Sequence, residues 1–297
     1  WHRSLWEAGI ATDIVPVGWR LDGYRLVVVP AVFIDRPELA GHLEQAVAAG
    51  AQVVVAGPTG VVDPNAGAVL GGYLGSLRPL LGVRVTDHAA LTGPVGQSDP
   101  RGALVNRLSR AVGTPGSETW VGLEAVSEPL RRVLERMGTP APDLRAGGWA
   151  EELRVDAGSN EAPQDAQAGQ DRGAVEVVAV FDGRGGGADL AGRPAVTRRT
   201  MAGAGAGWYV AADLDSLSRA ALLRLVCAHA RVRPVVADLP DGVEAQRRGE
   251  ILFLLNHGDR AAEVAGVMGT DLLTGDACTG HVVLAPRSAL VVRDNMR

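Results

Sequence analysis

The sequence predicts an α/β protein built on a parallel sheet, followed by a small antiparallel β domain. Two continuous apolar runs, residues 26–29 and 52–56, are typical of strands that are buried on both faces of a parallel sheet. Between them, residues 38–49 carry apolar side chains at helical spacing, and Gly50 occupies the position of a glycine that ends a helix. This strand, helix, strand unit implies parallel pairing. From residue 243 onward, short strands alternate with turns, which indicates the antiparallel domain.

The residues before the first strand predict a helix and a further strand. The letters WHRSLWEA, residues 1–8, read as the later part of an amphipathic helix, and TDIVP, residues 12–16, reads as a short strand. A helix that begins without a cap, immediately before a strand, suggests that sequence upstream has been lost. We therefore expect the chain to be a fragment of a longer protein.

The middle of the chain predicts further strands and helices, with two segments of a different character. Residues 139–148 (TPAPDLRAGG) are expected to form a turn-rich connector. Residues 156–172 are polar and small, which predicts a mobile insertion. The expected elements are a helical turn at 77–81, strands at 83–85, 120–126, 151–155, 175–181, 194–201 and 207–211, and helices at 128–137 and 216–231, the last capped by Asp215 or Ser216.

Composition excludes several classes of protein. The chain of 297 residues is 46% hydrophobic and 21% charged, which fits a globular protein with a sizeable core. A net charge of −5 argues against a nucleic-acid partner. The two cysteines, far apart in sequence, exclude a disulfide scaffold and favour a reducing compartment, and Cys227 is interpreted as a buried apolar residue. Because there is neither a signal peptide nor a membrane-spanning run, we expect a cytoplasmic protein without a membrane partner.

The acidic residues do not predict a catalytic pair. A glycosidase needs two carboxyl groups about 5–5.5 Å or about 6.5–9.5 Å apart. Glu151 and Glu152 are adjacent in a predicted strand, so they point to opposite faces and cannot flank one bond; we interpret them as a solvated strand edge. Asp63 and Glu124 lie near strand ends without an identifiable partner, and we interpret them as turn or cap residues. No catalytic residue is predicted in this chain.

Cofactor and metal sites are not predicted either. The glycine-rich segments 183–187 and 203–207 do not open a helix, as a phosphate-binding loop must, and we interpret both as turns. The six histidines are scattered without metal-ligand spacing. His257, at the end of a predicted strand, is expected to make a hydrogen bond in a turn or between domains.

Several segments, taken in order, resemble one family. HRSLWEAGIATDIVP, YRLVVVPAVF, AGAQVVVAGPTGVVD, LGGYLGSLRPLLGVRV, WAEELRV, GRPAVTRR and GAGWYVAADLD resemble the second domain of family 42 glycoside hydrolases, the β-galactosidases. PVVADLPDGVEAQRR, ILFLLNHGD and GTDLLTG resemble the small C-terminal β domain of the same enzymes. The resemblance covers essentially the whole chain, but the family's catalytic (β/α)₈ barrel has no counterpart in it.

The resemblance implies a fold and a division into domains. It implies a flavodoxin-like, class I glutamine amidotransferase-like parallel sheet domain over residues 1–232 and an antiparallel β domain over residues 233–297. It also implies that the first strand of the sheet is missing, which would leave two buried strands without their shared neighbour. The cysteine nucleophile of an amidotransferase is absent, because no cysteine precedes Cys227.

The resemblance also implies a function. The parent enzyme would hydrolyse terminal non-reducing β-D-galactosides, and this chain would hold it together as a homotrimer without being catalytic itself. Its partners would be other copies of the chain and the barrel of the same polypeptide. Tyr73, Trp19 and Trp149 are candidates for contacts near the active sites of the trimer, although we favour core packing for them.

Two other hypotheses stay open. The first is a stand-alone α/β enzyme or sugar-binding module, with its site in the loops that follow the first two buried strands, residues 30–36 and 57–73. An aromatic content of 4% weakens a carbohydrate platform. The second is a degenerate relative of the glycosidases that lacks catalytic glutamates throughout.

Overall fold

The computed structural model forms two compact units. One contains residues 16–230, and the other combines residues 1–15 with residues 231–297. The second unit resumes at residue 231, beside the boundary expected from the sequence, and it also takes in the first 15 residues. The insertion expected at 156–172 falls, apart from its two end residues, outside the described residues, which are 1–90, 120–138, 144–156, 172–201, 203 and 205–294.

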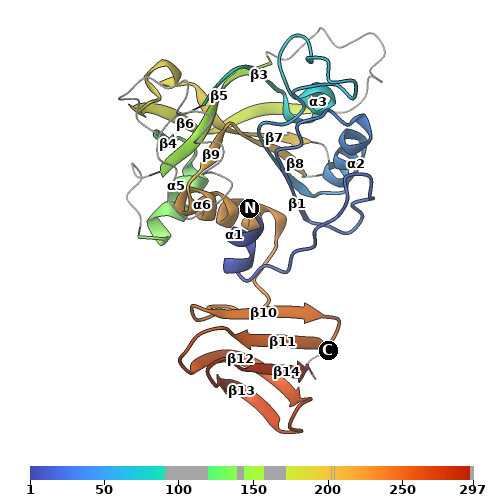
Figure 1. The fold of residues 1–297 in the computed structure, drawn as a ribbon, viewed down its shortest axis with the longest axis vertical. Helices are drawn as coiled ribbons and strands as arrows, with labels where there is room; N and C mark the ends of the chain where they lie inside the picture. Colours follow the sequence, from blue (N-terminus) through green and yellow to red (C-terminus); the bar gives the residue numbers. More distant parts are fainter. Residues whose placement is uncertain (91–119, 139–143, 157–171, 202, 204, 295–297) are drawn as a thin grey trace. The chain divides into compact units, whose positions relative to one another are not determined.

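The larger unit is built on a mixed sheet of nine strands (Figure 1), which run in the order β1-β2-β8-β7-β6-β4-β5-β3, with β9 paired to β5. The prediction of a parallel sheet is therefore right only for β1, β2 and β8, and the remaining pairs are antiparallel. The reason is connection length: β6 reaches β7 through residues 186–193, too few for a parallel crossover. The strands are β1 (Leu26–Pro30), β2 (Gln52–Ala56), β3 (Val83–Ala90), β4 (Trp120–Ala125), β5 (Leu144–Val155), β6 (Arg172–Gly185), β7 (Pro194–Met201), β8 (Ala206–Val210) and β9 (Ala212–Leu214).

Strand β1 lies at one edge of this sheet. It pairs in parallel with β2 from Leu26 opposite Gln52 to Pro30 opposite Ala56. The expectation that a missing strand would separate these two strands is therefore wrong, because they are hydrogen-bonded to each other along their whole length. The strand predicted at residues 12–16 is wrong, because residues 11–16 are irregular. With no neighbouring strand to accept its hydrogen bonds among the described residues, this short segment has nothing to hold it extended.

Helices cover both faces of the sheet. Side chains alternate along a strand, so Gly207 and Trp208, which are neighbours in β8, point to opposite faces of the sheet. A β-carbon on Gly207 would lie 3.0 Å from Leu80 O and 3.2 Å from Leu80 Cγ of α3, whereas the Trp208 ring packs at 5.5 Å from the His229 ring of α6. The predicted cap of α6 is confirmed, since Asp215 Oδ1 accepts the Ser218 N–H at 2.7 Å. The helices are α2 (Pro37–Ala48), α3 (Arg78–Leu81), α5 (Glu128–Arg136) and α6 (Ser216–Ala230), with 3₁₀ turns η1 (Gly75–Leu77) and η3 (Ala188–Leu190).

Strand β5 begins earlier than the sequence predicts. Residues 144–148 were expected in a turn-rich connector, yet they are the first part of this strand. The cause is the partners on either side, since Leu144–Gly147 pair with β4 and Trp149–Val155 pair with β3. Tertiary pairing overrides the weak strand propensity of a segment that contains two adjacent glycines.

The smaller unit carries a separate antiparallel sheet of five strands in the order β10-β11-β14-β12-β13, which confirms the antiparallel domain. Its core includes Leu254 and Val292, both fully buried. Helix α1 (His2–Glu7) belongs to this unit, and the Val235 N–H donates to Gly9 O at 2.8 Å. The strands are β10 (Val243–Arg248), β11 (Ile251–Asn256), β12 (Ala262–Asp271), β13 (Ala277–Leu284) and β14 (Ala289–Arg293).

Candidate functional site

The loops that follow β1 and β2, for which the sequence predicts a site in one of the open hypotheses, lie side by side. Phe33 O accepts the Val61 N–H at 2.8 Å, and the Asp35 N–H donates to Val62 O at 2.7 Å. Val62 forms a bridge with Ile34 on one side and with Ala68 on the other. The two loops therefore form a short extension of the sheet beyond the carboxyl ends of its parallel strands.

A third loop, residues 70–76, is joined to the first two. The Leu74 N–H donates to Gly60 O at 3.1 Å. The Ser76 hydroxyl donates to Asp35 Oδ1 at 2.6 Å, and the Ser76 N–H also faces this carboxylate at 3.2 Å. Gly75 has φ 45° and lies against Asp35, so a side chain at this position would displace the carboxylate. One carboxylate thus connects segments that are 41 residues apart.

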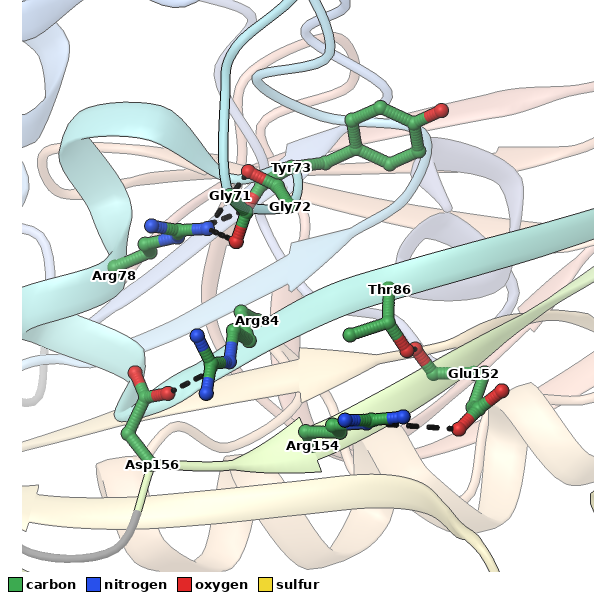
Figure 2. Close-up of polar contacts among 9 residues, drawn as sticks. All are labelled: Gly71, Gly72, Tyr73, Arg78, Arg84, Thr86, Glu152, Arg154 and Asp156. Atoms are coloured by element: carbon green, nitrogen blue, oxygen red, sulfur yellow. Dashed lines mark hydrogen bonds and ion pairs between the residues drawn. The ribbon is translucent and has the colours of Figure 1, made fainter.

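Arg78 fixes the shape of this third loop from inside (Figure 2). Its Nη2 donates to Gly71 O and, at 2.8 Å, to Gly72 O, and its Nε donates to Tyr73 O at 3.3 Å. All three acceptors are backbone carbonyls of successive residues. A planar guanidinium with several N–H donors suits such a fan of acceptors, and these bonds replace the sheet or helix partners that the loop backbone lacks.

We call residues 31–36, 57–63 and 67–76 the loop platform. Three of its side chains are apolar and exposed: Phe33 is 50% exposed, Ile34 37% and Leu70 88%. The backbone beneath them is held by the hydrogen bonds described above. Exposed apolar side chains on a firmly held backbone are typical of a contact surface rather than of a catalytic cleft.

The strands next to the platform contribute polar contacts at the surface. In Figure 2, Arg84 faces Asp156 at 3.4 Å and Arg154 faces Glu152 at 3.8 Å. These pairs are partly exposed, so each contributes little to stability. The Tyr73 ring packs at 5.5 Å from the ring of His88 on β3, which helps to position the platform against this strand.

Glu151 is not a solvated strand-edge residue, which corrects the interpretation made from the sequence. It is 1% exposed, and the Tyr209 hydroxyl donates to its Oε2. Burial raises the pKa of Glu151 to about 7, and the hydrogen bond from Tyr209 opposes this rise. The same burial, together with the negative charge of Glu151, raises the pKa of Tyr209 well above its usual value. The partner comes from β8, 58 residues away, so no local pattern indicated it.

The environments of the three other acidic residues that the sequence singled out are as follows: one is near an arginine, one is in a turn and one is exposed on a strand. Glu152 is half-buried and lies 3.6 Å from Arg193 Nη2. Asp63 has the turn role that was expected, since its Oδ1 accepts the Asn65 and Gly67 N–H groups at 2.8 Å. Glu124 is exposed within β4 and not in a turn or cap, which corrects that interpretation.

The aromatic residues, the histidine, the cysteine and the glycine-rich segments that the sequence singled out lie in different environments. Trp19 is 62% exposed, so core packing is wrong for this residue, whereas Tyr73 and Trp149 are half-buried.

His257 Nε2 lies 3.0 Å from Glu244 Oε2 within the small unit. Cys227 is buried as expected, and burial raises the pKa of its thiol to about 11. Residues 183–185 end β6 instead of forming a turn throughout, and 203–207 lie partly outside the described residues.

The described residues contain no group of three or more His, Cys, Asp or Glu side chains arranged to hold a metal ion. In the same part of the chain, the helices are too short or too polar to cross a bilayer.

Comparison with known proteins accounts for both units. Residues 1–98 match the family model described as the β-galactosidase trimerisation domain, and residues 242–294 match the model described as the β-galactosidase C-terminal domain. Both models belong to the same family, and together they span about half of the chain. This chain belongs to glycoside hydrolase family 42.

Family 42 relatives extend well beyond the region that this chain covers. The β-galactosidase of an Arthrobacter species is 31% identical over 287 residues, which are 95% of this chain and 32% of the relative. The β-galactosidase BglY of Alicyclobacillus acidocaldarius is 30% identical over 270 residues, 89% of this chain and 31% of the relative. The chain spans about a third of the length of these curated relatives.

A solved structure supports the fold of the family 42 chain. The crystal structure of β-galactosidase from Bacillus circulans sp. alkalophilus superposes with a TM-score of 0.73 at 22% sequence identity, covering 98% of this chain and 36% of that one. The fold of the mixed sheet and the fold of the antiparallel sheet are therefore both found in a solved β-galactosidase.

Proposed function

We propose that this chain is the assembly portion of a β-galactosidase-like glycoside hydrolase that acts on terminal non-reducing β-D-galactosides. In this proposal the chain itself is not catalytic, and it holds copies of the polypeptide together as a homotrimer. The observation that carries the proposal is the loop platform, whose exposed apolar side chains all lie within the residues that match the trimerisation model.

The chemistry of the platform supports self-association. Phe33 and Leu70 present apolar surface to solvent, and burying such surface between subunits is favourable. Because hydrogen bonds already hold the loops, little conformational entropy remains to be lost on binding. A closed trimer needs a heterologous contact, so the platform would meet a different patch on the neighbouring copy.

The carboxylates support a non-catalytic role. Glycoside hydrolysis requires two carboxyl groups facing one bond. Glu151 is enclosed with Tyr209, and Glu152 follows it on a strand whose successive side chains point to opposite faces. The catalytic pair of the parent enzyme would come from the barrel expected in the same polypeptide.

Two finer assignments belong to the same proposal. The parallel strands β1, β2 and β8, with α2 and α6 packed on the sheet, fit a flavodoxin-like relationship for the domain over residues 1–232, and residues 233–297 would be the C-terminal domain. We assign the protein to the cytoplasm, and its two free cysteines suit a reducing compartment.

Analytical ultracentrifugation of the 297-residue chain tests the assembly role. We expect a species of three times 30.8 kDa, and we expect Phe33→Asp combined with Leu70→Asp to give a folded monomer. A charge at an exposed position alters stability little but opposes burial of the platform. The matched control is Leu273→Asp, since Leu273 is 64% exposed and lies outside the trimerisation match. A trimer that survives the double substitution would exclude the platform as the contact.

Calorimetry separates this proposal from the sugar-binding module that the sequence leaves open. Titration of the chain with galactose and lactose is expected to give no heat of binding. Micromolar binding, abolished by Trp19→Ala or Tyr73→Ala, would favour the module instead.

A further inference from the structure

The carboxyl group of Glu151 lies directly beneath the turn that follows β2. A β-carbon placed on Gly57 would lie 2.6 Å from Glu151 Oε1 and 2.7 Å from Oε2, so both oxygens face the turn backbone. The Tyr209 hydroxyl donates to Oε2 from β8, the strand that leads into β9, which pairs with β5. With 1% of the residue exposed, the carboxyl group is closed off from solvent, and the backbone of the turn at Gly57 is packed directly against it.

The same turn connects the three loops of the platform. Thr59 Oγ1 accepts the Val32 N–H at 3.1 Å and donates to Ala56 O at 2.6 Å. The Gly60 N–H donates to Val32 O at 2.9 Å, and Gly60 O accepts the Leu74 N–H at 3.1 Å. A displacement of the 57–60 turn would therefore release contacts to both of the other platform loops.

The groups around Glu151 offer little compensation for a negative charge. Opposite it on β3 is His88, whose exposed ring packs on Tyr73, and next to it on β5 is Glu152. From β8 it meets Tyr209, and on β9 the acidic Asp213 is paired with Arg219. Within the described part of the chain, Glu151 takes part in no ion pair, and its side-chain partner is the Tyr209 hydroxyl.

We propose that Glu151 makes the loop platform sensitive to pH: the neutral carboxyl group holds the 57–60 turn closed, and the ionised group opens it and weakens self-association. The last step rests on the assembly role proposed above. The physical reason is that an unpaired carboxylate is strongly disfavoured away from water, and the simplest route to solvent is displacement of the turn that covers it.

The direction of the pH dependence follows from the protonation equilibrium of Glu151. Burial raises the pKa of Glu151 to about 7, so the closed state is fully favoured below the ordinary glutamate range and is lost as the pH rises through 7. Between pH 6 and pH 8.5 the protonated fraction falls by about 30-fold. If only protonated chains present an intact platform, the apparent association constant falls by up to about 30-fold per protomer.

Sedimentation equilibrium of the 297-residue chain at pH 6, 7 and 8.5 tests the proposal. We expect association of the unmodified chain to weaken with rising pH, and that of Glu151→Gln to change much less, because the amide remains neutral. Glu152→Gln is the matched control and should behave like the unmodified chain. If Glu151→Gln and the unmodified chain follow the same pH profile, the proposal is wrong.

A second measurement does not depend on assembly. Amide hydrogen exchange of Gly60 and Leu74, compared between the unmodified chain and Glu151→Gln at each pH, reports opening of the turn directly. Exchange in the unmodified chain should accelerate relative to the variant above pH 7. A chain that is monomeric at every pH would defeat the assembly role and leave this readout intact, while equal exchange in both proteins would defeat the switch.

Tyr209→Phe provides an independent variant if Glu151→Gln does not fold. The Tyr209 hydrogen bond lowers the pKa of Glu151, so its removal should move the opening transition to higher pH. A transition that stays in place or moves to lower pH would contradict the assignment to Glu151.

Discussion

Strands β1 and β2 have similar sequences but differ in burial. LVVVP and QVVVA each carry three consecutive valines and pair with each other in parallel. In β2, Val53, Val54 and Val55 are fully buried, whereas in β1 the first three residues are half-buried. The difference arises because β2 lies between β1 and β8, while β1 is at the edge of the described sheet.

The comparison shows what an apolar run does and does not predict. It indicates a strand, because β-branched residues pack well on a pleated surface. It does not indicate whether neighbouring strands flank that strand on one side or both. A strand at the edge of a sheet can accept another strand, so β1, like β3 at the other end of the described order, is open to further pairing in a way that β2 is not.

The largest difference in stability between the two strands is expected when a charge is introduced at two paired positions. Val28 and Val54 face each other in the register of β1 and β2. Val54→Asp should lower the free energy of unfolding by more than about 5 kcal/mol, because it buries a carboxylate without a partner. Val28→Asp should cost roughly 1–2 kcal/mol, because the side chain can reach water. Urea unfolding followed by circular dichroism measures both, and equal losses would show that β1 is covered in solution.

The turns that follow β1 and β2 also differ in how they tolerate a change of side chain. Gly57, after β2, has no room for a β-carbon beside the Glu151 carboxyl group. Gly57→Ala should therefore cost roughly 2 kcal/mol by overpacking. The same substitution in a Glu151→Ala background should cost clearly less, and the coupling is read from a double-mutant cycle by thermal unfolding. Additive effects would mean that the two residues do not touch.

The smallest effect is expected at the turn after β1. Ala31 has φ 51°, a left-handed conformation that is unfavourable for a residue with a β-carbon. Ala31→Gly should stabilise the protein by about 0.5 kcal/mol, because the relief of strain exceeds the added entropy of the unfolded chain. Chemical denaturation is sensitive enough to detect this gain. A loss of stability would indicate that Ala31 is not strained in solution.

The sequence predicted the elements of this fold better than their pairing. Strand β2 begins and ends at the residues expected, and the cap of α6 was identified from Asp215, because both depend on local patterns. The antiparallel pairing of β6 with β7 depends on how the chain returns across the sheet, which periodicity does not encode. The segment at 12–16 has strand propensity but no strand beside it, so it is irregular.

The sequence indicated the loops of the candidate site, but it did not indicate their key contacts. The rule that ligands gather at the carboxyl ends of parallel strands pointed to residues 30–36 and 57–73, which hydrogen bonds join in the structure, and a function for these loops stays a prediction. The contacts of Asp35 with Ser76 and of Glu151 with Tyr209 join residues 41 and 58 positions apart. Such pairs are created by the tertiary fold, and an acidic residue in a strand gives no local sign that it will be buried.

The way in which Arg78 holds the third loop has a consequence for how this surface can vary. The guanidinium bonds to the carbonyl oxygens of Gly71, Gly72 and Tyr73, and these oxygens exist whatever side chains the loop carries. The loop can therefore keep its shape while Leu70, which is exposed, is exchanged. Divergence within the family, or deliberate redesign of this surface, can thus change the side chain at this position on the same loop backbone.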